Sequence, residues 1–192
     1  MYNNTKFWES AARYGAMLGA VEAAFTAIDA TLSPQSPTVS LLVSVADTAL
    51  FVTLLTLFAN RRAAMVGRDK GFTYGNCLKF ILAMSLFAGV LTGAYSIVAS
   101  NFLYPQKYCE IIDRVVASLS MTGLYSDRML DYMRQVYEKV FFSPLWVVLT
   151  NVAAMAVKGL FFGLFVAAFA RREPMGPNRD PQRNDDNDDD II

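Results

Sequence analysis

One uninterrupted apolar stretch dominates the hydropathy pattern of the chain. Residues 80–104 read FILAMSLFAGVLTGAYSIVASNFLY and contain no charged side chain. As an α-helix this stretch would be about 37 Å long, which is enough to cross a hydrocarbon core of about 30 Å with some tilt. The pattern therefore predicts a membrane-spanning helix, whose bounds we place at residues 78–104.

Three further apolar segments are long enough to cross a membrane as helices. They predict spans at residues 7–31, 39–59 and 144–170, and an uncharged turn with two prolines separates the first two. Together with residues 78–104 they predict an all-α fold, an integral membrane bundle of four transmembrane helices.

The first of these segments is the least apolar, because it contains Glu22 and Asp29. A cleaved secretory signal peptide is the alternative interpretation of this segment. Glu22 interrupts its apolar region and no clear cleavage site follows, so we favour an uncleaved span. Its small and polar residues share one helical face, which suits contact with other helices: Trp8, Gly15, Gly19, Glu22, Thr26 and Asp29.

Residues 105–143, between the last two spans, are polar and helical in pattern. Their five basic and five acidic side chains balance, and apolar residues recur at helical spacing. Gly123 and Ser126 suit the end of one helix and the start of the next. We predict two amphipathic helices forming an extracytoplasmic hairpin that lies over the bundle; a single long helical connector is the alternative.

The basic residues at the span ends predict the orientation of the bundle. Short loops rich in Lys and Arg face the cytoplasm, and residues 60–70 form such a loop. Both termini are then cytoplasmic, in a protein of the cell (inner) membrane. Residues 1–172 form the predicted transmembrane domain, and residues 173–192 are expected to be a disordered acidic tail. The basic residues in question are Arg61, Arg62, Arg68, Lys70, Arg171 and Arg172.

The composition agrees with a membrane location and argues against several activities. Only 18% of the residues are charged, against about 25% in soluble domains. A soluble helical bundle remains an alternative, but the asymmetry of loop charge opposes it. The chain has no histidine and no net charge, so histidine-based catalysis, histidine metal sites and a general attraction to nucleic acid are not expected. Cys77 and Cys109 read as ordinary thiols, and we expect no enzyme activity, metal or cofactor.

Several motifs resemble those of a known family. They are FWESAARYGAMLGA in the first span, GFTYGNCLKF and SLFAGVLTGAYSIV in the third, NFLYPQKY at its end, and SPLWVVLTNV and KGLFFGLFVAAF in the fourth. Over residues 6–172 the chain resembles domain-of-unknown-function family 4199, a bacterial family of membrane proteins with four spans. The resemblance implies a four-helix integral membrane protein and carries no activity, ligand or catalytic residue.

Three ionisable side chains fall at similar depth in three different spans. Depth in the membrane can be measured by helical rise from the midpoint of each span. On this measure Lys158 lies at the membrane midplane, and Glu22 and Asp47 lie roughly 3–5 Å outward of it. Because one charge at a helix centre costs about 2.5–3.5 kcal/mol on insertion scales, we expect these charges to face inward and pair. The predicted buried cluster is Glu22, Asp47 and Lys158 with Asn151 nearby, Lys158 pairing with one carboxylate while the other is protonated.

The cluster has three possible roles. It could be a structural ion pair that specifies helix order, or it could have a functional role, as a proton or ion relay or as the anchor point for a small polar solute. If the depths are misplaced, the charges would instead line an interface or face another subunit.

A stripe of small residues on the third span lets another helix approach closely. We favour a structural or interaction protein, with lipid, membrane-protein partners or further copies of the chain as partners. A small proton- or ion-coupled transporter or channel is the alternative. The stripe is Ser85, Gly89, Gly93, Ser96 and Ser100.

Overall fold

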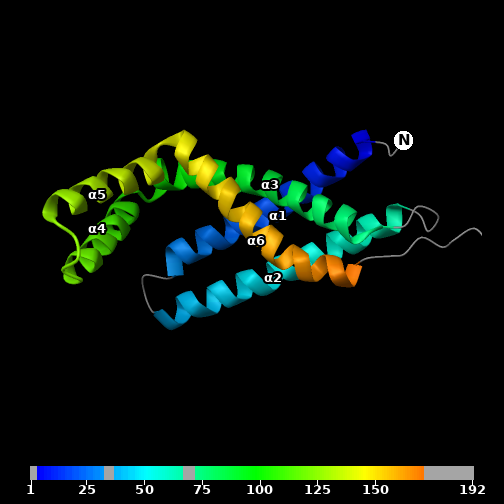
Figure 1. Ribbon diagram of the computed structural model, residues 1–192, viewed down its shortest axis with the longest axis horizontal. Helices are drawn as coiled ribbons and strands as arrows, with labels where there is room; N and C mark the ends of the chain where they lie inside the picture. Colours follow the sequence, from blue (N-terminus) through cyan, green and yellow to red (C-terminus); the bar gives the residue numbers. More distant parts are fainter. Residues whose placement is uncertain (1–3, 33–36, 67–71, 171–192) are drawn as a thin grey trace, which may run out of the picture.

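The secondary-structure elements of the described chain are all helices, which confirms the all-α prediction (Figure 1). The computed structural model describes residues 4–32, 37–66 and 72–170. The predicted turn before residue 37, part of the basic loop and everything from residue 171, including the acidic tail, lie outside them. In chain order the helices are α1 (Asn4–Leu32), α2 (Pro37–Met65), α3 (Tyr74–Val98), the π-helix η2 (Ala99–Leu103), α4 (Pro105–Met121), α5 (Asp127–Phe142) and α6 (Pro144–Ala170).

Within the described residues, three helical segments are long and apolar enough to cross a membrane by length and composition. They are Thr38–Met65, Tyr74–Leu103 and Pro144–Ala170, and they contain the predicted second and fourth spans and all but the last residue of the third. These long apolar helices indicate a membrane-embedded, multi-pass protein. Helix α1 has the same 29-residue length as α2, but its more polar composition leaves it outside this group.

The helices extend beyond the predicted spans where no residue stops them. Helix α2 continues to Met65 instead of ending at residue 59, because good helix formers follow residue 59 and no glycine or proline precedes Gly67. At the far end of α3, Pro105 has no N–H to continue the helix. The chain widens there into η2, whose hydrogen bond runs from Tyr104 N–H to the Ala99 carbonyl at 2.8 Å.

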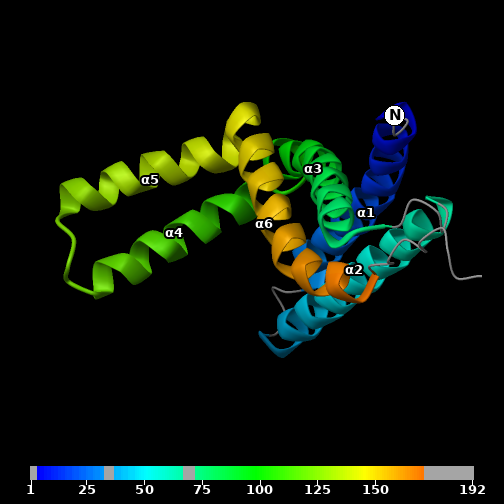
Figure 2. The same cartoon turned by 45° about the vertical axis from the view of Figure 1, so that its right-hand side comes forward.

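Helix α3 is the centre of the bundle. It lies between α1 and α6, with which it makes its most extensive contacts (Figure 2). Phe80, Ile81 and Met84 of α3 are fully buried in this core. Helix α2 packs mainly against α1 and α6 and touches α3 little. The N-terminal end of α1 and the C-terminal end of α6 are both on the side of the bundle opposite the hairpin (Figure 1).

The first part of the predicted basic loop is helical, and one of its arginines is buried. Arg62 is only 6% exposed, in contrast to the solvated position that a loop predicts. Its guanidinium carbon lies 6.0 Å from the ring centre of Phe7 and 5.9 Å from that of Phe80. Its Nη1 donates to Ser10 Oγ at 3.1 Å. A planar, weakly hydrated guanidinium tolerates such an aromatic site far better than an ammonium does.

Helices α4 and α5 form an antiparallel hairpin that rules out the single-connector alternative (Figure 2). Gly123 follows the last turn of α4 with a φ of 65°, a conformation that glycine adopts without a steric penalty. Ser126 precedes α5 in extended conformation. Between the two helices Ile112 is buried, and Arg134 donates to Asp113 at 2.6 Å.

The prediction that this hairpin lies over the bundle is wrong. The hairpin projects from the end of the bundle, away from α1 and α2 (Figures 1 and 2). The reason is local: only Tyr104 separates η2 from α4, and only Ser143 separates α5 from α6. The backbone angles at these two residues, φ −137° and ψ 46° at Tyr104 and φ −79° and ψ 120° at Ser143, set the direction of the hairpin.

Candidate functional site

Helices α3 and α6 approach so closely that only small residues fit between them. A Cβ atom at Gly89 would lie 2.6 Å from the Val152 Cα, and one at Gly93 would lie 3.0 Å from the Cα of an α6 residue. Gly159 of α6 lies directly against the Ser85 hydroxyl. Contacts this short are typical of helices that associate through small residues in membranes.

The part of the small-residue stripe that is nearest the hairpin is polar and also faces α6. Ser96 Oγ donates to Asn151 Oδ1 at 3.3 Å. Ser96, Ser100 and Asn151 line a cavity of about 200 Å³ at the root of the hairpin. The structure therefore places every residue of the predicted stripe, four on α3 and Ser100 on η2, on the side that faces α6 or this cavity.

Helix α1 uses the same device on another face of α3. A Cβ at Gly15 would lie 2.6 Å from the Met84 carbonyl oxygen, and one at Gly19 would lie 2.8 Å from the Ala88 carbonyl oxygen. With α1 and α6 both held close to α3, their remaining faces meet α2. Three ionisable side chains come together there.

Lys158 of α6 bridges two carboxylates on two other helices. Its Nζ donates to Glu22 Oε1 of α1 at 2.8 Å and to Asp47 Oδ2 of α2 at 2.8 Å. The Lys158, Glu22 and Asp47 side chains are 23%, 11% and 21% exposed. The same Nζ lies 4.3 Å from the ring centre of Phe51, a distance at which an aromatic face attracts a cation.

This geometry differs in two respects from the predicted cluster. Lys158 pairs with both carboxylates instead of one, because Glu22 and Asp47 approach it from different helices. Asn151 lies seven residues before Lys158, about 10 Å along the helix. It bonds with Ser96 of α3, as described above, and its amide donates to the Val147 carbonyl at 2.8 Å.

Sequence reasoning missed Phe51, which completes the surroundings of the lysine. The available signal is its spacing, since Phe51 follows Asp47 by four residues and so shares its helical face. Phe51 is 1% exposed and also packs edge-on against Phe162 of α6 at 6.0 Å. It therefore covers the side of the ammonium that the carboxylates leave open.

A polar pocket of about 300 Å³ lies between α1 and α2 and reaches the cluster. It lies towards the C-terminal end of α1 and the N-terminal end of α2, the end of the bundle from which the hairpin projects (Figure 1). The Lys107 ammonium of α4 donates to the carbonyl of Ala30, near the C-terminal end of α1. The pocket is lined by Glu22, Phe25, Thr26, Asp29, Ser40, Val43, Ser44 and Asp47.

The chemistry of the cluster follows from its charges. With all three groups ionised, one ammonium faces two carboxylates and the formal charge is −1. Each carboxylate uses one oxygen on Lys158 and has a second oxygen available as an acceptor. The site can therefore accept further hydrogen bonds, and it links α1, α2 and α6 at one depth. Among the described residues, no group of three metal-ligating side chains is placed to hold a metal ion.

One known protein family matches nearly all of the described residues. The sequence model of one family, described as "Protein of unknown function (DUF4199)", matches residues 13–172. The chain belongs to this family. The resemblance inferred from its motifs is thereby confirmed, and the DUF4199 match includes Glu22, Asp47 and Lys158. No curated protein and no solved structure matches the chain. The DUF4199 description names no activity.

Proposed function

We propose that this DUF4199 protein is a structural or interaction protein of the cell (inner) membrane, with four spans and with the α4–α5 hairpin as its contact element. The observation that carries the proposal is the hairpin itself. It projects beyond the apolar helices (Figure 1), and α5 exposes large apolar side chains on it.

The packing of α1 supports its role as the fourth span. Gly15 and Gly19 hold it against α3, and its most central charge, Glu22, is paired with Lys158. An inward-facing, paired carboxylate costs much less in a bilayer than one facing lipid. Asp29 faces the polar pocket instead of the outer surface.

The distribution of basic residues supports cytoplasmic termini. Arg61 and Lys79 lie at the end of the bundle opposite the hairpin, and the sequence adds Arg68 and Lys70 between them. Basic residues on short loops stay in the cytoplasm during insertion. The hairpin, whose basic and acidic residues balance, is then extracytoplasmic.

Native electrophoresis of solubilised membranes tests the interaction role. We expect the wild type to migrate in an assembly larger than one protomer. The double change Tyr132→Ser with Val136→Ser on the exposed face of α5 should shift it to the protomer, with an unchanged thermal midpoint. Arg114→Ser on α4 serves as the control and should leave the assembly intact. Migration of the wild type as a single protomer would contradict the proposal.

The pocket between α1 and α2 favours a second candidate function, proton- or ion-coupled transport. A polar cavity that reaches a buried ionisable cluster is what such a pathway requires. In proteoliposomes that contain a pH-sensitive dye, an imposed proton gradient should decay faster than in protein-free vesicles, and Glu22→Gln should abolish the difference. Glu9→Gln, the same change at an exposed position of α1, is the control. Equal decay with and without protein would exclude this candidate.

A further inference from the structure

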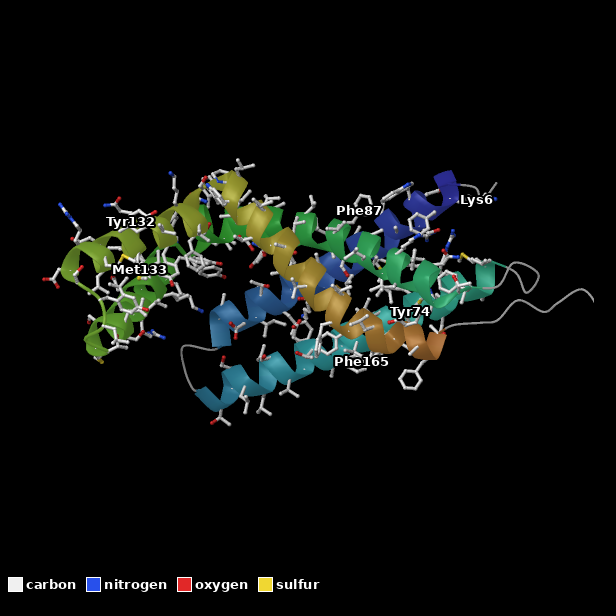
Figure 3. The ribbon with its side chains drawn as sticks, viewed as in Figure 1. Lys6, Tyr74, Phe87, Tyr132, Met133 and Phe165 are labelled. Atoms are coloured by element: carbon white, nitrogen blue, oxygen red, sulfur yellow. The ribbon has the colours of Figure 1, made fainter. Side chains whose placement is uncertain are left out.

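The outer face of α5 carries an apolar stripe with the spacing of a helix-pairing surface. Met129, Tyr132 and Val136 follow one another at steps of three and four residues and are 44%, 62% and 40% exposed. Figure 3 shows Tyr132 on the outer side of α5, whereas Met133 lies on the side towards α4. Steps of three and four residues are those of the apolar seam by which two helices pack side by side.

The stripe continues onto the tip of the hairpin. Leu124 is 82% exposed and Met121 is 87% exposed. Helix α4 exposes no other large apolar side chain in its described length, so the apolar surface is confined to α5 and the tip. Its extent along one helix suits an elongated partner, such as another helix, better than a globular one.

Unpaired positive charge flanks the stripe. Arg128 and Lys139 are exposed at its two ends, and neither forms an ion pair within the described residues. Arg134, on another face of α5, is instead neutralised by Asp113 and Glu138. Asp131 lies about 100° around the helix from Tyr132, away from the seam. A partner seated on the stripe therefore meets two exposed cations that form no ion pair within the described residues.

We infer that the α5 stripe binds an amphipathic helix of another membrane or extracytoplasmic protein, one whose apolar seam is flanked by Asp or Glu. The inference rests on the proposed interaction function and names the chemistry of the partner. Charges beside an apolar seam select the partner helix, because opposite charges attract and like charges exclude.

The other occupants fit less well. A second copy pairing in parallel would set Lys139 against Lys139, and one pairing antiparallel would set Arg128 against Lys139. The chain's own acidic C-terminal segment follows α6 in the sequence, and α6 ends on the side of the bundle opposite the hairpin (Figure 1). Lipid is disfavoured because Tyr132 lies about 15 Å beyond the root of α5, outside the apolar helices.

Photo-cross-linking from the stripe tests the inference. A photoreactive phenylalanine analogue replaces Tyr132 in the full chain in its native membrane, and the cross-linked peptide is sequenced by mass spectrometry. We expect a peptide with apolar residues at steps of three and four and a net negative charge. The double reversal Arg128→Glu with Lys139→Glu should lower the yield about tenfold. Arg114→Glu on α4 is the matched control and should change it less than twofold.

Each other outcome contradicts a distinct claim. A neutral or basic peptide, or a peptide from a second copy of the chain, overturns the acidic-helix inference and leaves the interaction function standing. Cross-linking to lipid alone, or to nothing, overturns both. If the charge reversal leaves the yield unchanged while the thermal midpoint is that of the wild type, charge does not select the partner.

Discussion

Removing the Lys158 ammonium should destabilise the bundle more than any other single change in the cluster. Lys158→Met keeps the length of the side chain but leaves Glu22 and Asp47 facing each other without a cation. Breaking a fully buried pair in this way costs about 3–5 kcal/mol. Because the three side chains are 11–23% exposed, we expect about 3 kcal/mol, or roughly 6–12 °C in the thermal midpoint of a protein of this size.

Neutralising the carboxylates as well should restore stability. Glu22→Gln or Asp47→Asn alone leaves one ion pair with Lys158 and should lower stability by less than about 1.5 kcal/mol. The triple variant buries no charge and should lie within about 1 kcal/mol of the wild type. Each double-mutant cycle between Lys158 and a carboxylate should give a coupling of about 1–3 kcal/mol.

The assay is thermal unfolding in detergent, followed by intrinsic fluorescence. Lys79→Met, the same substitution at an exposed site on α3, is the control and should change the midpoint by less than about 2 °C. Backbone hydrogen exchange adds a local readout. In Lys158→Met the loss of protection against hydrogen exchange should be concentrated in the outer half of α2, which is the N-terminal half nearest the hairpin. The reason is that the cluster provides a polar link between α2 and α6. If the triple variant is as unstable as Lys158→Met, or if Lys158→Met behaves like Lys79→Met, the pairing argument is wrong.

Two further substitutions test the close packing and the buried arginine. Gly93→Leu should lower the thermal midpoint by roughly 8 °C or more or prevent assembly, because even a Cβ added there would lie 3.0 Å from the α6 backbone. Gly75→Leu is the control, since a Cβ added there would meet no atom within 4 Å. Equal effects of the two changes would contradict the packing argument. Arg62→Met should lower stability by about 2 kcal/mol in the same unfolding assay, because it removes the hydrogen bond to Ser10 and the aromatic contacts. The control, Arg61→Met at an exposed position, should lower stability by less than about 0.5 kcal/mol. An Arg62→Met variant as stable as the wild type would show that the guanidinium is dispensable.

Much of the bundle could be predicted because helices have a fixed rise and a fixed angle per residue. Helical rise alone placed Glu22, Asp47 and Lys158 at similar depth, and in the structure these side chains meet. Helical angle alone put Ser85, Gly89, Gly93, Ser96 and Ser100 on one side of α3, where they face α6 or the cavity at the hairpin root. Depth and facing direction are local properties, so a sequence with long regular helices contains them.

The features that sequence missed depend on how separate helices meet. That Lys158 would reach both carboxylates depends on where α1 and α2 approach α6. The burial of Arg62 depends on Phe7 and Phe80, which come from two other helices. The direction of the hairpin depends on the angles at Tyr104 and Ser143, and a single residue between two helices can turn the chain in many directions.

Close contacts between small residues hold some of the helices together, whereas the ion pairs of Lys158 hold α2. This difference indicates which part of the molecule can change shape. Helices α1, α3 and α6 are held by close contacts of small residues over much of their length, an arrangement with little freedom to move. Helix α2 touches α3 little, and its outer half is separated from α1 by the polar pocket. The Lys158 bridge to Asp47 lies at the inner end of that pocket. Loss of this bridge would free the outer half of α2 and leave the packing of the other three helices intact. A change in α2 alone is therefore the conformational response that the structure allows most readily, whether the cluster serves helix order or transport.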